Sequence, residues 1–274
     1  MDTPVSNIDI TSFPAADPEM EAMLDAGVHR GHNRSKRHPA MGQFVWGTRS
    51  NIEIIDLLKT REKLAEALHF LHEIASRGKL ILFVGTRPST HELLRETAES
   101  LGYPYVNRRW IGGTLTNFKV IFKRVETLES LEQDKATGGF EKYTKKERLV
   151  KEDVMNRLRQ NFDGLRKLRR LPDAVIIMGI HHDTLALAEA RGLNIPVVAL
   201  TDTNTDPRLA TYPIPSNDDA RTAVRYMLSR IHDSLRDGQD HPATPPVPEV
   251  VGGTPTVAVA VATAEVDSSV VSTQ

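Results

Sequence analysis

The sequence predicts a doubly wound α/β domain, Rossmann-like or flavodoxin-like, with an inserted helical hairpin and a disordered C-terminal tail. Apolar strand patterns alternate with amphipathic helices, which is typical of a parallel sheet covered on both faces. The alternation pauses over residues 116–168, where two helices follow one another, and no periodicity remains after residue 235. With 274 residues, 39% of them hydrophobic, the chain can bury the core that this fold needs.

The clearest strand of the N-terminal half is the apolar run 79–84, which ends at Gly85 and is expected inside the sheet. Asp17 and Pro18 form an N-cap and first-turn pair, and Gly27 ends the helix that follows. The other elements expected here are, in order, strands at 44–46 and 52–55, a helix over 64–74 closed by Gly78, a helix over 89–101 and a strand over 103–106.

Residues 116 to about 134 and about 144 to 168 both show the apolar spacing of a coiled coil. In each segment apolar residues step by three and four positions: Phe118, Ile121, Val125 and Leu128, then Met155, Leu158, Phe162 and Leu165. A turn with Gly138 and Gly139 joins the segments. Two helices of similar length with a short glycine turn predict an antiparallel coiled-coil hairpin.

Alternation resumes in the C-terminal part, which returns the chain to the sheet. The expected elements are a strand over 174–179, a helix over 184–190 ended by Gly192, a strand over 195–201 and a final helix from about 217 to 235. The predicted organisation is a flexible N-terminus (1–17), an α/β domain (18–115 and 169–235), an inserted hairpin (116–168) and a disordered tail (236–274).

Composition narrows the class of protein. The chain has no cysteine, which excludes disulfides, thiolate metal sites and cysteine catalysis. Its N-terminus lacks the basic flank and apolar core of a signal peptide, and no apolar run is long enough to span a bilayer. We therefore expect a cytoplasmic protein with no membrane partner.

The net charge of -1 hides a segregated distribution. Residues 116–170 contain 15 Lys and Arg against 9 Asp and Glu, and the stretch between Asp25 and Glu53 has basic but no acidic residues. Each patch alone is explained by a solvated surface, but together they predict phosphate contacts. The predicted RNA-binding residues are Arg30, Arg34, Lys36, Arg37, Arg49, Arg87, Arg108, Arg109, Lys119, Lys123, Lys145 and Lys146.

The segment NRRWIGGTLTNF at 107–118 combines paired arginines, an aromatic residue and a double glycine beside the hairpin. Arginine suits the forked geometry of phosphate, and glycine permits close backbone approach, so the segment predicts a contact surface. Trp110 can stack on an unpaired base or pack into the core. For Trp110 alone, the core role is favoured.

No motif indicates catalysis or a nucleotide cofactor. Gly85, Thr86 and Arg87 follow a strand as in phosphate loops, yet the stretch lacks the second glycine and the lysine of such loops, which favours a turn glycine. His181 and His182 are expected in a surface turn, where Asp183 or Thr184 caps the next helix. We therefore expect no enzyme and no small-molecule substrate.

A divalent metal is one further hypothesis. His32, Asp202, Asp218 and Asp219 follow strands or open the last helix, so they are candidates to converge near one sheet edge as ligands. Helix capping by Asp218 and Asp219 explains the same residues without metal and is the favoured interpretation. No other cofactor is expected.

Seven blocks of the sequence resemble, in order, the small-subunit ribosomal protein two family. They are MLDAGVHRGH (23–32), FVGTR (83–87), NRRWIGG (107–113), LTN (115–117), LPDA (171–174), DTNTDP (202–207) and IPSNDDA (214–220). The resemblance covers about residues 19–235 and implies a non-catalytic scaffold that contacts 16S ribosomal RNA in cytoplasmic ribosomes. It also implies neighbouring small-subunit proteins as partners, including the mRNA-capturing ribosomal protein one.

Two other function classes fit the same fold. A small-molecule enzyme or nucleotide-binding protein would use the strand-end loops, and saturable NAD or ATP binding would support it. A protein-binding adaptor with a coiled-coil arm explains the hairpin but not its positive charge. Salt-sensitive RNA binding distinguishes the ribosomal scaffold from that adaptor.

Overall fold

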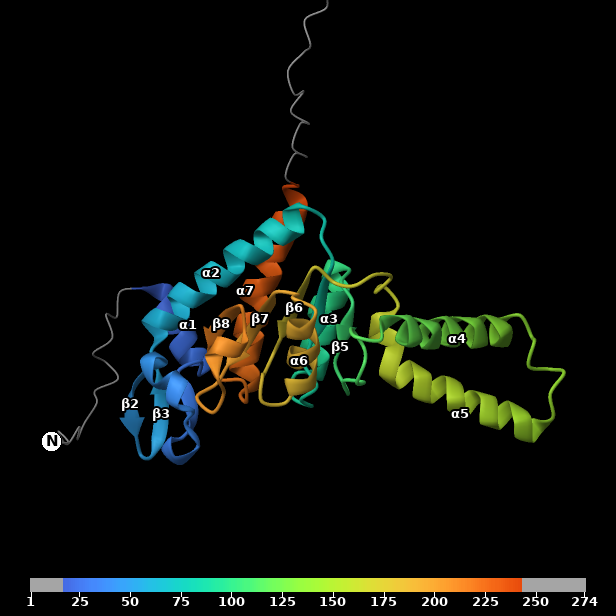
Figure 1. Cartoon of the computed structure of the whole chain (residues 1–274), viewed down its shortest axis with the longest axis horizontal. Coiled ribbons are helices and arrows are strands. Elements are labelled where there is room, and N and C mark those ends of the chain that lie inside the picture. Colours follow the sequence, from blue (N-terminus) through green and yellow to red (C-terminus); the bar gives the residue numbers. More distant parts are fainter. Residues whose placement is uncertain (1–16, 243–274) are drawn as a thin grey trace, which may run out of the picture. The chain divides into compact units, whose positions relative to one another are not determined.

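The computed structural model describes residues 17–242 and contains a five-stranded parallel sheet (Figure 1). In spatial order its strands are β5 (Tyr105–Val106), β4 (Ile81–Val84), β6 (Ala174–Ile177), β7 (Val197–Thr201) and β8 (Tyr212–Pro215). Numbered along the chain, these five strands have the order 2-1-3-4-5, which is the flavodoxin-like order of a doubly wound sheet. The predicted α/β class is confirmed.

Helices cover both faces of this sheet. The core on one face is formed with α1 (Pro18–Ala26), α2 (Leu57–Ser76), α3 (His91–Leu101) and α7 (Arg221–Asp240), and on the other with α6 (Thr184–Gly192). The central strand β4 therefore contacts a core on each side. Ile81 and Phe83 face the first core, whereas Leu82 and Val84 face the second, and all four side chains are fully buried. A continuous apolar run is therefore needed in a central strand.

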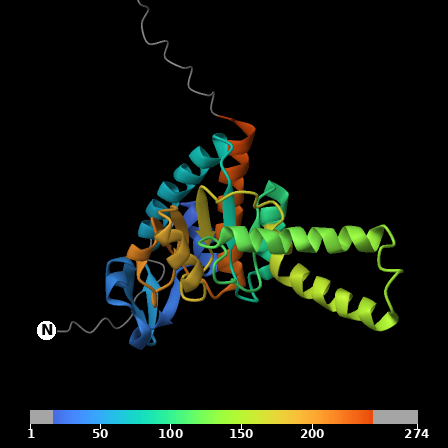
Figure 2. The ribbon, with the colours of Figure 1, turned by 45° about the vertical axis from the view of Figure 1, so that its right-hand side comes forward.

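The two helices expected between β5 and β6 are α4 (Phe118–Ala136) and α5 (Lys145–Phe162), which lie side by side in Figures 1 and 2. A capping box between Thr144 and Glu147 begins α5. The second helix was expected to extend to residue 168, but α5 ends at Phe162. A short 3-10 helix, η4 (Asp163–Leu165), follows α5, and Gly164 passes so close to β5 that a Cβ there would lie 2.3 Å from the Tyr105 carbonyl oxygen.

A second, antiparallel sheet was not predicted. Its strands are β1 (Arg30–Asn33), β2 (Val45–Arg49) and β3 (Ile52–Ile55), and β3 lies between the other two. Two 3-10 helices, η2 (Arg34–Lys36) and η3 (Pro39–Phe44), connect β1 to β2 along the chain. No strand is predicted from the sequence at residues 30–33. These residues have no apolar alternation, and their conformation is set by pairing with β3.

The ends of several elements also differ from expectation. Strand β8, preceded by η5 (Pro207–Leu209), was missed because Pro213 and Pro215 lack backbone N–H groups, which an edge strand tolerates. Helix α7 runs to Asp240, so residues 236–240 of the expected tail are helical, and Gln239 Nε2 donates a 3.0 Å hydrogen bond to the Leu101 carbonyl. The rest of the tail from residue 243, and residues 1–16, lie outside the described residues.

The N-terminal helix forms as predicted. Asp17 accepts a hydrogen bond from the Glu19 amide, and Gly27 ends α1 at a φ of 76°. None of the helices between residues 17 and 242 is both long enough and apolar enough to cross a membrane.

Candidate nucleic-acid interface

The small antiparallel sheet and the loop after β1 present five of the predicted RNA-contacting residues, all with exposed side chains. They are Arg30, Arg34, Lys36, Arg37 and Arg49. Arg37 Nη1 lies 3.5 Å from Oε2 of Glu53, which is fully buried. Within residues 17–242, the other four have no carboxylate oxygen within 4.0 Å. Four cations of this region are therefore available to an external phosphate.

The loop after β5 holds Arg108 and Arg109 next to a buried anchor. Both arginines are exposed, whereas Trp110 is 7% exposed and packs in the second core. The core role favoured for Trp110 is confirmed. The arginines therefore sit on a loop whose next residue is fixed in the core.

Glu189 on α6 organises this loop, a role that was not predicted from the sequence. Its Oε1 accepts hydrogen bonds from Trp110 Nε1 (3.0 Å) and the Gly113 amide (2.7 Å). Its Oε2 accepts them from the Leu115 amide (2.9 Å) and from the amide and hydroxyl of Thr116 (both 3.2 Å). Glu189 is the only carboxylate of α6, and an isolated acidic residue in this helix is the one sequence feature that could have indicated its role.

These contacts set the charge state of Glu189. Burial raises the pKa of its carboxyl, but the hydrogen bonds from Trp110, Gly113, Leu115 and Thr116 outweigh burial and hold the pKa below its ordinary value. The carboxylate stays ionised and accepts all five bonds. The loop that carries the paired arginines is thus ordered by one charged side chain.

The basic residues of the helical pair fall into two classes. Some are paired within it: Arg159 and Arg166 with Glu132, Arg169 with Glu129, and Lys135 with Glu152. The four lysines predicted as RNA contacts are exposed and, among the described residues, have no carboxylate within 4.0 Å. They are Lys119, Lys123, Lys145 and Lys146. The predicted site residues thus lie in separate regions: the small sheet, the loop after β5, the helical pair and, for Arg87, an acidic cluster.

Arg87 is engaged inside the protein. Its Nη1 donates to the Asp218 carbonyl (2.8 Å) and contacts the carboxylates of Asp218 and Asp219, and its Nη2 lies 2.6 Å from His182 Nε2. His32 joins the same cluster, because its Nδ1 lies 3.1 Å from Asp202 Oδ2 and its Nε2 lies 3.5 Å from Asp219 Oδ2. The four candidate metal ligands therefore converge at the ends of β7 and β8.

The capping interpretation of these aspartates is wrong. Helix α7 has Ala220 at its N-cap without a side-chain cap, and Asn217 Oδ1 accepts from the amides of Asp219 and Ala220. Likewise, Asp183 occupies the N-cap position of α6, but its side chain makes no cap hydrogen bond and its Oδ2 instead accepts from the Thr86 amide. In both places the carboxylates bind partners from other elements.

The acidic cluster has an unusual charge balance. Burial and the neighbouring Asp202 carboxylate raise the pKa of Asp218 to about 7, and its Oδ2 has no hydrogen-bond partner among the described residues. The hydrogen bond with Asp202 raises the pKa of His32. No group of three or more His, Asp or Glu side chains in residues 17–242 is arranged to hold a metal ion, and Arg87 lies against two of the candidates. The divalent-metal hypothesis stays a prediction, which elemental analysis of chelator-free protein for zinc tests.

Gly85 at the end of β4 has a packing role. A Cβ added there would lie 2.7 Å from Leu94 Cδ1 and 3.2 Å from Met178 Cβ. The glycine lets α3 pack closely against the sheet. The glycine at this position is therefore explained by packing.

Comparisons with known proteins give one consistent result. Residues 23–238 match the family model described as Ribosomal protein S2. The chain is 44% identical over 216 residues to the small ribosomal subunit protein uS2 of Thermus thermophilus, and these residues cover 79% of this chain and 84% of the relative. It is 44% identical over 221 residues to the uS2 of Dictyoglomus thermophilum (81% and 90% covered) and 41% identical over 219 residues to that of Mycolicibacterium vanbaalenii (80% of each).

Proposed function

Because the chain belongs to the ribosomal protein S2 family, we propose that it is a non-catalytic component of the small ribosomal subunit that binds 16S ribosomal RNA through exposed arginines and lysines. Family membership supports the structural ribosomal role. The RNA contact is supported by the loop after β5, where Glu189 orders a turn that exposes Arg108 and Arg109. An ordered loop reduces the backbone entropy that is lost when its guanidinium groups bind phosphate.

The test is a double substitution, Arg108→Ala with Arg109→Ala, in the full chain. We expect lower occupancy of the variant in small subunits on a sucrose gradient, and a shallower dependence of its binding on salt than in wild type, because two phosphate contacts are removed. The matched control is Arg191→Ala with Arg225→Ala, which removes two exposed charges from α6 and α7. Equal occupancy of both double variants and wild type would contradict the proposed contact.

We also propose two finer features that follow from the predicted architecture. The pair α4 and α5 acts as an antiparallel coiled coil, a proposal supported by burial of Leu128 and Met155 and by the Lys135–Glu152 ion pair of 2.7 Å. Its free lysines then extend the RNA-binding surface. The disordered tail remains a prediction, and limited proteolysis that first removes residues after 242 would support it.

Neighbouring small-subunit proteins, including the mRNA-capturing ribosomal protein one, are the proposed protein partners in cytoplasmic ribosomes. Family membership is the support for this proposal. Chemical cross-linking of assembled subunits, with identification of the linked peptides by mass spectrometry, tests it. Cross-links confined to this chain would count against a role in seating other proteins.

A further inference from the structure

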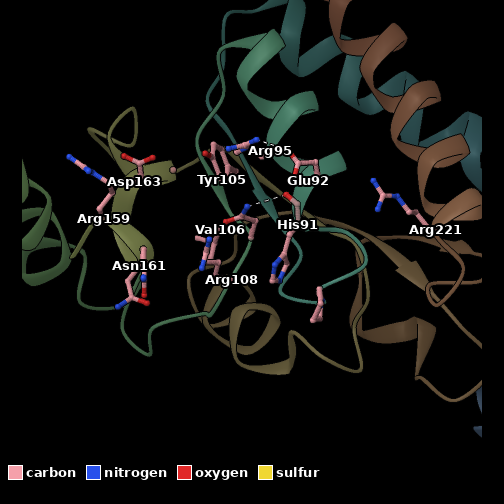
Figure 3. A pocket seen from close by; sticks show the side chains of 14 residues that line it. His91, Glu92, Arg95, Tyr105, Val106, Arg108, Arg159, Asn161, Asp163 and Arg221 are labelled. Atoms are coloured by element: carbon pink, nitrogen blue, oxygen red, sulfur yellow. Dashed lines mark hydrogen bonds and ion pairs between the residues drawn. The ribbon is translucent and has the colours of Figure 1, made fainter. Parts of the chain in front are cut away.

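A cavity of about 520 Å³ opens where four separate elements meet (Figure 3). Its walls come from the first turns of α3, the end of β5 and the loop after it, the end of α5 with η4, and the start of α7. Each element contributes one arginine. They are Arg95, Arg108, Arg159 and Arg221.

The carboxylates that line the cavity have ion-pair partners, whereas two of its arginines have none among residues 17–242. Its two carboxylates have partners, since Glu92 lies 2.5 Å from Arg95 and Asp163 lies 2.8 Å from Arg166 outside the cavity. By contrast, Arg108 and Arg221 are exposed and, in the described part of the chain, have no carboxylate within 4.0 Å. The cavity therefore holds two guanidinium groups without a counter-charge.

The remaining lining favours an anion and not an apolar ligand. Asn107 Nδ2 donates to the His91 carbonyl, which fixes the loop of Arg108 against α3, and the Asn161 side chain lies on the opposite wall. The N-terminal turn of α3 adds the partial positive charge of its helix dipole. Tyr105 is 8% exposed and its hydroxyl binds Glu99, so it offers no free ring face.

We propose that this cavity is a phosphate-binding site for a strand of ribosomal RNA, with backbone phosphates of the strand contacting Arg108 and Arg221. The inference rests on the proposed RNA contact and adds Arg221 to it. The volume suits a ligand larger than one phosphate group. A free nucleotide offers the same phosphate chemistry, but its base needs a mainly apolar or aromatic lining, whereas most of the residues that line this cavity are polar or charged.

Directed cleavage of the RNA tests the site in assembled subunits. The chain has no cysteine, so Gln160→Cys in the cavity wall gives a single attachment point for an iron chelate that cleaves nearby RNA. We expect cleavage of 16S RNA from this position and none from Glu62→Cys, an exposed position on α2. Val120→Cys on α4, which is 47% exposed, reports the contact of the helical pair.

The outcomes separate the two proposals. Cleavage from Val120→Cys without cleavage from Gln160→Cys overturns the cavity site and leaves the proposed RNA-binding function intact. Absence of cleavage from both positions, in subunits shown to contain the protein, overturns the cavity site and the proposed RNA contact of the helical pair. Cleavage from Gln160→Cys supports the cavity site.

A binding measurement on Arg221→Gln and a matched control variant complements the directed-cleavage experiment. We expect Arg221→Gln to weaken binding of the full chain to 16S RNA about tenfold, as for loss of one charge-assisted hydrogen bond. The slope of log affinity against log salt should fall by about 0.7 to 0.9. Arg225→Gln, one turn further along α7, is exposed and outside the cavity and should leave both unchanged. Equal loss in both variants overturns the assignment.

Calorimetry with ATP distinguishes the two sources of phosphate. The RNA assignment predicts no saturable binding of ATP to the purified full chain at physiological salt. Stoichiometric ATP binding that is lost in Arg221→Gln and kept in Arg225→Gln would assign the cavity to free nucleotides instead. Thermal unfolding of both variants checks that each is folded.

Discussion

Replacement of Glu189 by glutamine is expected to disorder the loop that presents Arg108 and Arg109. The substitution keeps the shape of the side chain but turns one carboxylate oxygen into an amide NH₂ group. One oxygen of Glu189 accepts from Trp110 and Gly113, and the other accepts from Leu115 and Thr116. Whichever way the amide is oriented, two N–H donors of the loop face a donor.

The magnitude follows from the bonds that are lost. Each hydrogen bond to a charged acceptor contributes about 1.5–3 kcal/mol, and the bonds that remain weaken to the neutral value of about 1 kcal/mol. Partial exposure of Glu189 reduces the sum, so we expect the free energy of unfolding to fall by about 3 kcal/mol. For a folded unit of this size, the melting temperature should drop by about 6–12 °C.

Thermal unfolding and amide hydrogen exchange provide the assay. Exchange should accelerate at the amides of Gly113, Leu115 and Thr116, which lose their acceptor. The difference between wild type and Glu189→Gln should shrink as pH falls through the lowered pKa of Glu189, because protonation removes the charge that the folded state stabilises. Glu96→Gln, an exposed position on α3, is the control. Unchanged melting and exchange in Glu189→Gln would refute this account of the loop.

Three further substitutions test other parts of the structure. Asp218→Asn should raise the free energy of unfolding at pH 8 but not at pH 4, because burial and a neighbouring carboxylate raise the pKa of Asp218 from 3.8 to about 7. The protonated carboxyl stabilises the folded state relative to the ionised one, and this stabilisation is lost as pH rises between those two values. Urea unfolding curves with the same pH dependence as wild type would argue against this account. Gly164→Ala should lower the free energy of unfolding by about 1–3 kcal/mol or more, because its Cβ would lie 2.3 Å from the Tyr105 carbonyl oxygen, whereas Gly112→Ala has open space; thermal melts compare the two. Thr144→Ala removes the capping box of α5 and should cost about 1 kcal/mol of helix stability, seen as faster amide exchange in the first turn of α5; unchanged exchange there would exclude a stabilising cap.

The acidic cluster shows where local reasoning fails. Asp218 and Asp219 precede a helix, and that position alone favours capping. In the folded chain they instead face Arg87, which is 131 residues away in sequence from Asp218. No spacing rule links these positions, because the contact exists only after β4 and β8 enter one sheet.

The same limit applies to the loop after β5. The sequence shows that Arg108, Arg109 and Trp110 belong together, since they are adjacent. It does not show that Glu189, 79 residues after Trp110, supplies the acceptor for this loop. A single carboxylate among the alanines and leucines of α6 was a visible anomaly, but its partner depends on how α6 packs.

The sequence by itself determined the elements whose patterns are local. The apolar runs of β4, β6 and β7, the helical spacing of α2 and the cap at Asp17 each follow from neighbouring residues. Only the tertiary structure decided the pairing of β1 with β3, the edge position of β8 and the meeting of four arginines in one cavity. The reason is physical: burial and backbone periodicity act between near neighbours, whereas pairing and charge act between whatever the fold brings within a few ångströms.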